Sequence, residues 1–337
     1  MSLFEALKIA IAFLPIIIFL VSMWFLDSFQ LLKKKDVILA IVVGLAVAGL
    51  AILVNSSIIQ YTEISRVAFS RLIAPVTEEI LKILFVIYLI RASKVGFMVD
   101  AAILGFAVGA GFAIIENIYY LGVLTEADLL TWFVRGFGTA VMHGGTTAIA
   151  AIISKDLSDR KKWSPFLIFI PGLSAAILLH ALFNMFILPP TTSTLFIILV
   201  LPPVFYAVFK KSEQNTRLWL GTGLDSDLEM LQILKAGNIS ETKIGKYLKS
   251  IQDKFPPLVV GDIICYLRIY LELSIKAKGI LILKESGIDL PPEPEMEAQF
   301  IELNYLDKQI GKTGKLAIQP LLKINNTDLW QLSMMRS

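Results

Sequence analysis

The chain has 337 residues, of which 56% are hydrophobic and 18% charged, and its formal net charge at pH 7 is +3. Because this net charge is small, we expect no nucleic-acid partner. Its single cysteine, Cys265, excludes an internal disulfide. Before residue 210 the chain repeats apolar runs that are long enough to cross about 30 Å of hydrocarbon. After that point charged residues return, and the pattern is that of a soluble domain.

Seven apolar segments are candidate membrane spans. They lie at about 5–26, 37–54, 72–90, 97–120, 129–153, 164–188 and 192–209. The first resembles a signal peptide, but it contains Pro15 and is followed by "DSFQLLKKKD" where a small-residue cleavage site would stand, so we interpret it as a retained span. The sequence therefore predicts an all-α fold, in which a polytopic membrane domain at 1–211 precedes a soluble helical domain at 212–337.

Basic residues of the short loops predict the orientation of these spans. They lie after the first, third, fifth and seventh spans: Lys33, Lys34, Lys35, Arg91, Lys94, Lys155, Arg160, Lys161, Lys162, Lys210 and Lys211. The intervening loops 121–128 and 189–193 have no lysine or arginine. We therefore expect an integral protein of the cell membrane with its N-terminus outside and its C-terminal domain in the cytosol. Segment 55–71, predicted to be a loop or an interfacial helix, contains two arginines that would lie outside.

Ionisable and amide side chains interrupt four of the apolar spans. They are Glu78, Glu79, Lys82, Asp100, Glu116, Asn117, Arg135, His143, His180 and Asn184. Both histidines of the chain are among them. At a rise of about 1.5 Å per residue, most of these groups reach a similar depth in the membrane, displaced away from the C-terminal domain. Because charges inside a bilayer are costly, their convergence predicts a functional site.

Purely structural explanations account for part of this set. Lys82 can neutralise Glu78 at i,i+4 or Glu79 at i,i+3, but a single lysine leaves the other carboxylate uncompensated. Glu116 can pair with Arg135 from the next span. The amides of both asparagines can bond between helices, and His143 can be a packing residue. The glycines Gly105, Gly109 and Gly111 favour close helix packing, since they do not follow a strand as a nucleotide-binding loop would.

Activation of water is the chemistry that best fits adjacent carboxylates with histidines and amides in a dry site. A buried carboxylate can act as the base, and histidine or asparagine donors can stabilise an oxyanion. A zinc ion held by His143, His180 and Glu79 is the alternative, although no H-E-x-x-H pattern is present. A non-enzymatic receptor or a proton-coupled carrier is a further alternative, in which the same carboxylates titrate.

Four short motifs resemble those of PrsW-type intramembrane proteases, which are similar to CAAX prenyl endopeptidases and bacteriocin-processing proteases. They are "EEILK" with Glu78, Glu79 and Lys82, "GAGFAIIENIYYL" with Phe112, Glu116 and Asn117, "MHGG" with His143, and "HALFN" with His180 and Asn184. They stand in the family's order on four successive apolar segments and cover residues 60–190.

This resemblance implies an intramembrane endopeptidase that cuts a membrane-anchored protein, for example in regulatory release of an anti-sigma factor. It implies that Glu78 or Glu79 activates the water, that no cofactor is required by this glutamate mechanism, and that His180 and Asn184 position the substrate and its oxyanion. Phe112-xxx-Glu116 departs from the Phe-xxx-His of prenyl endopeptidases. This departure leaves Glu116 and His143 as alternative proton-sharing partners and argues against a prenylated substrate.

Segments of helical periodicity dominate the C-terminal region, and they are interrupted at Pro256-Pro257 and at "LPPEPE". No catalytic motif is evident among them. We expect a small cytosolic helical domain there, with either a regulatory or a purely stabilising role.

Overall fold

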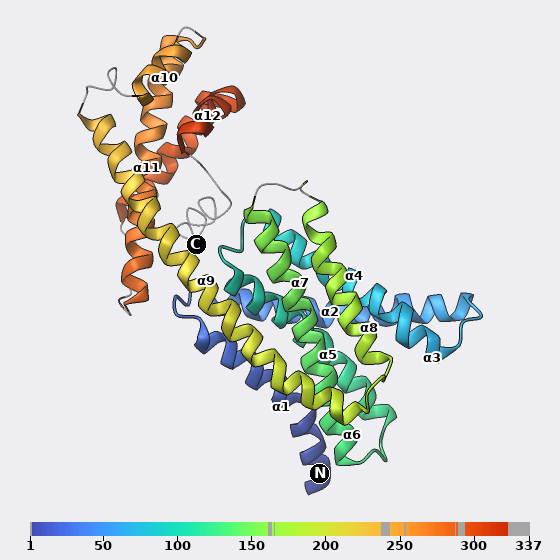
Figure 1. The fold of residues 1–337 in the computed structure, drawn as a ribbon. Coiled ribbons are helices and arrows are strands. Elements are labelled where there is room, and N and C mark those ends of the chain that lie inside the picture. The colour runs from blue at the N-terminus through green and yellow to red at the C-terminus, as the bar shows by residue number, and fades with distance from the viewer. Residues whose placement is uncertain are drawn as a thin grey trace. The chain divides into compact units, whose positions relative to one another are not determined.

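The computed structural model describes residues 2–160, 164, 166–236, 243–252, 254–286, 288 and 294–322. Throughout these residues the regular structure is helical, without strands (Figure 1). The chain forms two compact units, a membrane unit at Met1–Glu213 and a C-terminal unit at Gln214–Ser337.

The membrane unit is built from long helices joined by short turns. Its α-helices are α1 (Leu3–Leu26), α2 (Lys34–Tyr61), α3 (Arg66–Ala68), α4 (Ala74–Arg91), α5 (Met98–Val123), α6 (Leu129–Phe133), α7 (Val141–Asp159), α8 (Ile170–Asn184) and the first part of α9 (Pro190–Lys235). Two π-helical segments, η1 (Phe69–Ile73) and η2 (Val134–Ala140), lead directly into α4 and α7. A 3₁₀ turn, η3 (Leu167–Phe169), precedes α8.

Six helical segments of the described chain are long and apolar enough to cross a membrane. They are Leu3–Leu26, Lys34–Tyr61, Met98–Val123, Leu129–Asp159, Leu167–Asn184 and Pro190–Lys235. Helix α4, expected as a seventh span, is not among them, since four of its 18 residues are charged. The prediction of a helical integral membrane bundle is confirmed with six candidate spans. The seventh span, which the predicted orientation requires, stays a prediction. Lys161 and Lys162, two of the loop residues used to predict orientation, lie outside the described residues.

Helix α5 lies at the centre of the membrane unit and packs mainly against α2 and α7. Glycines allow this close approach. A Cβ atom on Gly109 would stand 2.1 Å from the carbonyl oxygen of His143, and one on Gly111 would stand 2.1 Å from that of Ile41. Gly105 meets α7 in the same way, with its Cβ position 2.8 Å from the Thr147 carbonyl oxygen. The packing role predicted for these glycines is therefore confirmed.

The second span is longer than the sequence pattern indicated. Helix α2 continues to Tyr61, so part of segment 55–71 extends this helix and does not form a loop. The chain then leaves the helical conformation at Thr62, and the Ser65 hydroxyl caps α3 by accepting a hydrogen bond from the Ala68 amide at 3.2 Å. The longer α2 has a direct consequence for the site, because Asn55 now lies on a helix that packs against α4.

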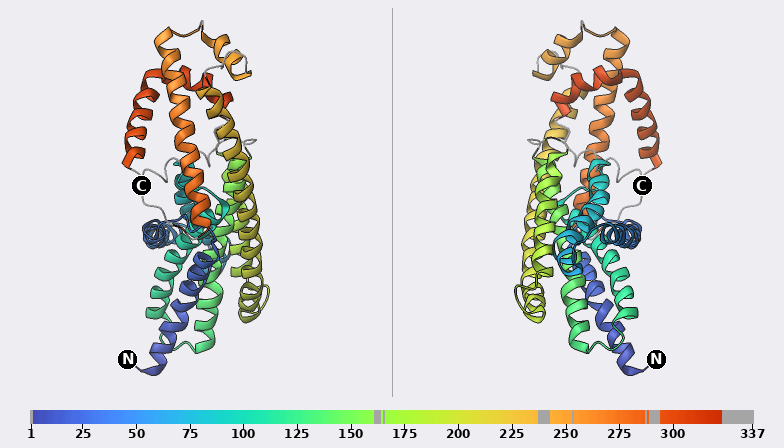
Figure 2. Two further views of the ribbon diagram at one scale, coloured as in Figure 1. Left: turned by 90° about the vertical axis from the view of Figure 1, so that its left-hand side faces the viewer. Right: turned by 90° about the vertical axis from the view of Figure 1, so that its right-hand side faces the viewer.

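Helix α8 and the beginning of α9 are joined by a turn, which both views of Figure 2 show, and the two helices diverge from it (Figure 1). The turn between them is short, running from Met185 to Pro189. His180 lies one turn before the end of α8, so this histidine is held close to the turn.

The C-terminal unit contains the end of α9 together with α10 (Lys243–Gln252), α11 (Pro257–Glu285) and α12 (Pro294–Leu322). Its apolar core joins Leu267, Tyr270 and Leu273 of α11 to residues such as Leu303 and Leu306 of α12. Helix α12 bends at Gly311, where the backbone φ of +61° departs from helical geometry. The described helices of this unit therefore share an apolar core of their own.

Candidate active site

Glu79 lies at the centre of a buried cluster formed by α4, α5, α7 and α8, and its side chain is only 1% exposed. A single oxygen, Oε1, accepts three hydrogen bonds: from Lys82 Nζ at 2.9 Å, from His180 Nδ1 at 2.9 Å and from Thr146 Oγ1 at 3.2 Å. Because two other helices contribute donors to this one oxygen, Glu79 ties α4 to α7 and α8.

Lys82 connects Glu79 to the first histidine. Its ammonium lies 2.8 Å from His143 Nδ1 and stands over the ring of Phe112, 4.1 Å from the ring centroid. An ammonium group can only donate, so Nδ1 of His143 accepts and the ring proton is assigned to Nε2. That nitrogen lies 2.8 Å from Glu116 Oε2 and therefore donates to it. The hydrogen-bond network thus fixes the tautomer of His143.

Glu116 also forms an ion pair with Arg135, as one structural explanation of these charges predicted, with 3.5 Å between Oε2 and Nη2. The guanidinium Nε donates to Asn117 Oδ1 at 3.1 Å, and the Asn117 amide donates to the backbone oxygen of Ala12 at 2.8 Å. Arg135 lies in the π-helical segment η2, and such bulges occur often at functional sites. Arg135 and Asn117 therefore connect Glu116 of the cluster to the backbone of α1.

Glu78 is held differently from its neighbour. Its Oε1 accepts a hydrogen bond from Asn55 Nδ2 of α2 at 3.2 Å, and Asn55 Oδ1 in turn accepts one from Thr77 Oγ1 at 2.6 Å. Its other oxygen, Oε2, lies 3.9 Å from Nε2 of His180. Since His180 donates through Nδ1 to Glu79, its Nε2 carries a lone pair that faces Glu78.

The cluster holds more carboxylates than cations. Lys82 neutralises Glu79, and Arg135 neutralises Glu116, whereas no lysine or arginine of the described chain forms an ion pair with Glu78. The Glu78 side chain is also more exposed, at 15%, than those of Glu79 and His180, at 1% and 2%. Glu116 is more exposed still, at 28%, but its Oε2 is paired with Arg135 and His143. Glu78 is therefore the carboxylate of the cluster that has no lysine or arginine partner among the described residues.

Asn184 does not join this hydrogen-bonded network. Its amide donates to the backbone oxygen of Ser70 in η1 at 3.0 Å. The bond ties the end of α8 to the segment that leads into α4. In this arrangement Asn184 fixes the position of helix α8, one turn after His180.

A divalent metal ion fits the donor set of the cluster. Glu78, His143 and His180 offer ligand atoms that all lie within 4.8 Å of one another, and two histidines with one carboxylate are a common catalytic zinc shell. Glu79, the carboxylate expected in such a shell, instead orients His180 through Nδ1. Both nitrogens of His143 already hold partners, so a metal there would replace one of its hydrogen bonds.

Three further residues contact the cluster but were not predicted from the sequence. Asn55 was missed because the second span was ended at residue 54, although an amide inside an apolar run is a usable signal. Thr77 and Thr146 were missed because threonine is common in membrane helices and gives no distinctive pattern.

Comparison with family models matches residues 33–208 to the PrsW family intramembrane metalloproteases. The matched region is slightly more than half of the chain and includes every helix that contributes to the cluster. Searches of curated proteins and of solved structures give no match.

Proposed function

The chain belongs to the PrsW family of intramembrane proteases, and we propose that it hydrolyses a peptide bond of a membrane-anchored protein with a water molecule activated by Glu78. The observation that carries this assignment is the contrast between the two adjacent glutamates. Glu79 Oε1 is saturated by three donors, whereas Glu78 Oε2 faces the lone pair of His180 Nε2 at 3.9 Å. One water molecule between these two atoms could hydrogen-bond to both.

The reaction would use these groups in turn. Glu78 takes a proton from the water, whose oxygen attacks the carbonyl carbon of the scissile bond. The resulting oxyanion needs a hydrogen-bond donor, for which Asn184 is the candidate after its amide releases the Ser70 oxygen. His180, which the resemblance also suggested for this role, already donates its Nδ1 proton to Glu79. Glu78 then returns its proton to the nitrogen of the leaving amine as the C–N bond breaks. Glu116 and His143 form the adjacent pair that can share this proton.

A zinc ion held by Glu78, His143 and His180 is the alternative that the donor set favours. When bound, zinc would supply Lewis-acid activation of water or of the scissile carbonyl. In that case Glu79 keeps the role of orienting His180. Its carboxylate, which accepts from Nδ1, would also make the His180 ring a more basic metal ligand. Metal analysis of purified protein distinguishes the two mechanisms, because only this alternative requires about one zinc per chain.

The substrate would be a single-span or otherwise membrane-anchored regulatory protein, such as an anti-sigma factor. The apolar surroundings of the cluster support a substrate that enters from the membrane, and the loop charges support a cut nearer the outer side. The protein itself would then lie in the cell membrane with its C-terminal unit in the cytosol.

The test compares protein N-termini in membranes of cells that produce the wild type, Glu78→Gln or Glu63→Gln. Glu63 is exposed in the turn after α2, so its substitution controls for the loss of a carboxylate. We expect a set of N-termini near apolar segments that disappears in Glu78→Gln and persists in Glu63→Gln. An unchanged set in Glu78→Gln, with the variant present at normal levels, contradicts the proposal.

A further inference from the structure

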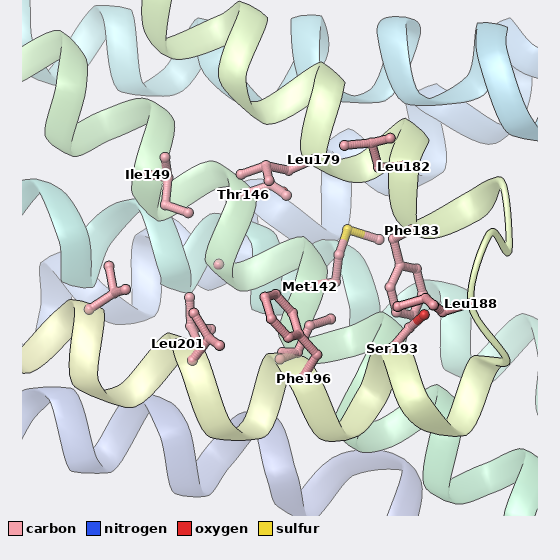
Figure 3. A pocket seen from close by; sticks show the side chains of 14 residues that line it. Met142, Thr146, Ile149, Leu179, Leu182, Phe183, Leu188, Ser193, Phe196 and Leu201 are labelled. Carbon is pink, nitrogen blue, oxygen red and sulfur yellow. The ribbon is translucent and has the colours of Figure 1, made fainter.

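An apolar cavity of about 290 Å³ lies in the membrane unit between α7, α8 and the beginning of α9. Figure 3 shows side chains of these three helices, among them Met142, Phe183 and Phe196, directed into the space between them. Of the residues that line the cavity, Thr146 and Ser193 are the polar ones, and the remainder are aliphatic or aromatic apart from one methionine and one glycine. The cavity therefore suits an uncharged, apolar group.

The cavity shares a wall with the catalytic cluster. On α7, the cavity is lined by Met142, just before His143 in the sequence, and by Thr146, three residues after it. On α8, it is lined in the same way by Leu179 and Phe183, which precede and follow His180. Thr146 belongs to both places, since its side chain lines the cavity while its hydroxyl donates to Glu79 Oε1 at 3.2 Å. A group bound in the cavity would thus lie beside the two histidines.

We propose that this cavity is a specificity subsite, which receives one large apolar side chain of the substrate next to the scissile bond. The inference rests on the proposed function, since it assumes that a peptide is cut at the cluster. Along an extended peptide, neighbouring residues are separated by about 3.3 Å, so the side chain next to the cut must be accommodated close to the histidines. The cavity is at the lower end of the range for ligand pockets, about 300–1,000 Å³, which fits a single side chain better than a lipid tail in full.

Gly145 controls the width of the cavity. A Cβ atom at this position would stand 3.0 Å from Cδ2 and 3.3 Å from Cδ1 of Leu201, which lines the opposite wall on α9. Alanine at position 145 therefore narrows the cavity, while its higher helix propensity supports α7. Shortening Leu201 to alanine removes the atoms that Cβ would meet. Gly145→Ala is therefore a variant with a narrowed cavity, and Gly145→Ala/Leu201→Ala is one in which the width is restored.

The experiment uses a single-span protein whose cleavage depends on Glu78, prepared with Ala, Leu, Phe or Asp on each side of the cleaved bond in turn. We expect the wild-type protein in membranes to cut the Leu and Phe versions about tenfold or more faster than the Ala and Asp versions at one of the two positions. Gly145→Ala should remove most of the preference for Phe, and Gly145→Ala/Leu201→Ala should restore it.

Leu199→Ala is the matched control, because Leu199 is 71% exposed on α9 and does not line the cavity. This variant should keep the wild-type preference. Cleavage of the Ala version reports that each variant is folded. A preference that is the same in wild type, Gly145→Ala and the double variant overturns the subsite. Absence of any Glu78-dependent cleavage overturns the proposed function and this inference with it.

Discussion

Lys82 is 0% exposed and is the cation that neutralises Glu79 inside the bundle. Replacing it with methionine keeps the apolar stem but leaves Glu79 as a buried charge without a counterion. Loss of one partner of a buried pair costs about 3–5 kcal/mol of unfolding free energy. We therefore expect Lys82→Met to lower the melting temperature strongly in thermal unfolding of the detergent-solubilised protein, and to abolish cleavage.

Lys155→Met is the control for this substitution. Lys155 is also buried, at 1% exposure, but its partner Asp159 is 38% exposed and can be hydrated when the lysine is lost. The expected decrease in melting temperature is therefore smaller. Equal decreases in the two variants would contradict the role of Lys82 as the counterion of the cluster.

Asn55 positions Glu78 from a neighbouring helix, and Thr77 in turn orients the Asn55 amide. Asn55→Ala removes the hydrogen bond to Glu78 without touching the substrate. Loss of such an outer-shell partner typically costs about 10–100-fold in activity. We expect kcat to fall by this factor while KM and the melting temperature change little.

Ser57→Ala on the same helix should leave both kinetic constants unchanged, because Ser57 is exposed and its hydroxyl bonds only to the backbone of its own helix in the described contacts. An Asn55→Ala variant with wild-type kcat would show that the hydrogen bond from Asn55 to Glu78 is not required for catalysis.

At the scale of helices, the site depends on how closely α5 and α7 approach each other. The Cβ of an alanine at Gly109 would stand 2.1 Å from the His143 carbonyl oxygen, and backbone cannot yield as a flexible side chain does. Gly109→Ala must therefore push α7 away and displace His143 from Lys82 and Glu116. We expect loss of cleavage together with a lower melting temperature.

Gly122 offers a control on the same helix, since nothing lies within 4 Å of the position that its Cβ would take. Gly122→Ala should preserve activity and slightly raise stability, because alanine is the better helix former by about 1 kcal/mol. If Gly109→Ala behaves like Gly122→Ala, the two helices do not need their close contact.

At the scale of the whole molecule, the basic loops predict that the C-terminal unit is cytosolic. Cys265 is the single cysteine of the chain and is exposed in that unit. It therefore reports orientation without any substitution. A membrane-impermeant maleimide should label Cys265 only after intact cells are opened.

The complementary variant is Cys265→Ser/Glu126→Cys, which moves the thiol to an exposed position in the loop between α5 and α6. This thiol should react in intact cells. Labelling of Cys265 in intact cells, with Glu126→Cys protected, would reverse the predicted orientation.

Much of the site could be predicted from the sequence, because the cost of charge in a membrane makes each buried ionisable residue conspicuous. Glu78, Glu79, Glu116, His143 and His180 were all recognisable in this way, and the structure brings them together. Asn184 was equally conspicuous, but its amide turns to the backbone of Ser70. Residue type thus identified which residues could belong to the candidate site, whereas the direction of each side chain depended on the packing of its helix.

The sequence by itself determined that this chain is a helical membrane protein, since apolar length and helical hydrogen bonding leave little choice in a bilayer. It also determined which family the chain belongs to. Only the tertiary structure separated the two adjacent glutamates, which are equivalent in the sequence. Neighbouring residues on a helix point about 100° apart, so Glu79 meets Lys82, Thr146 and His180 while Glu78 meets Asn55 and keeps one oxygen facing His180.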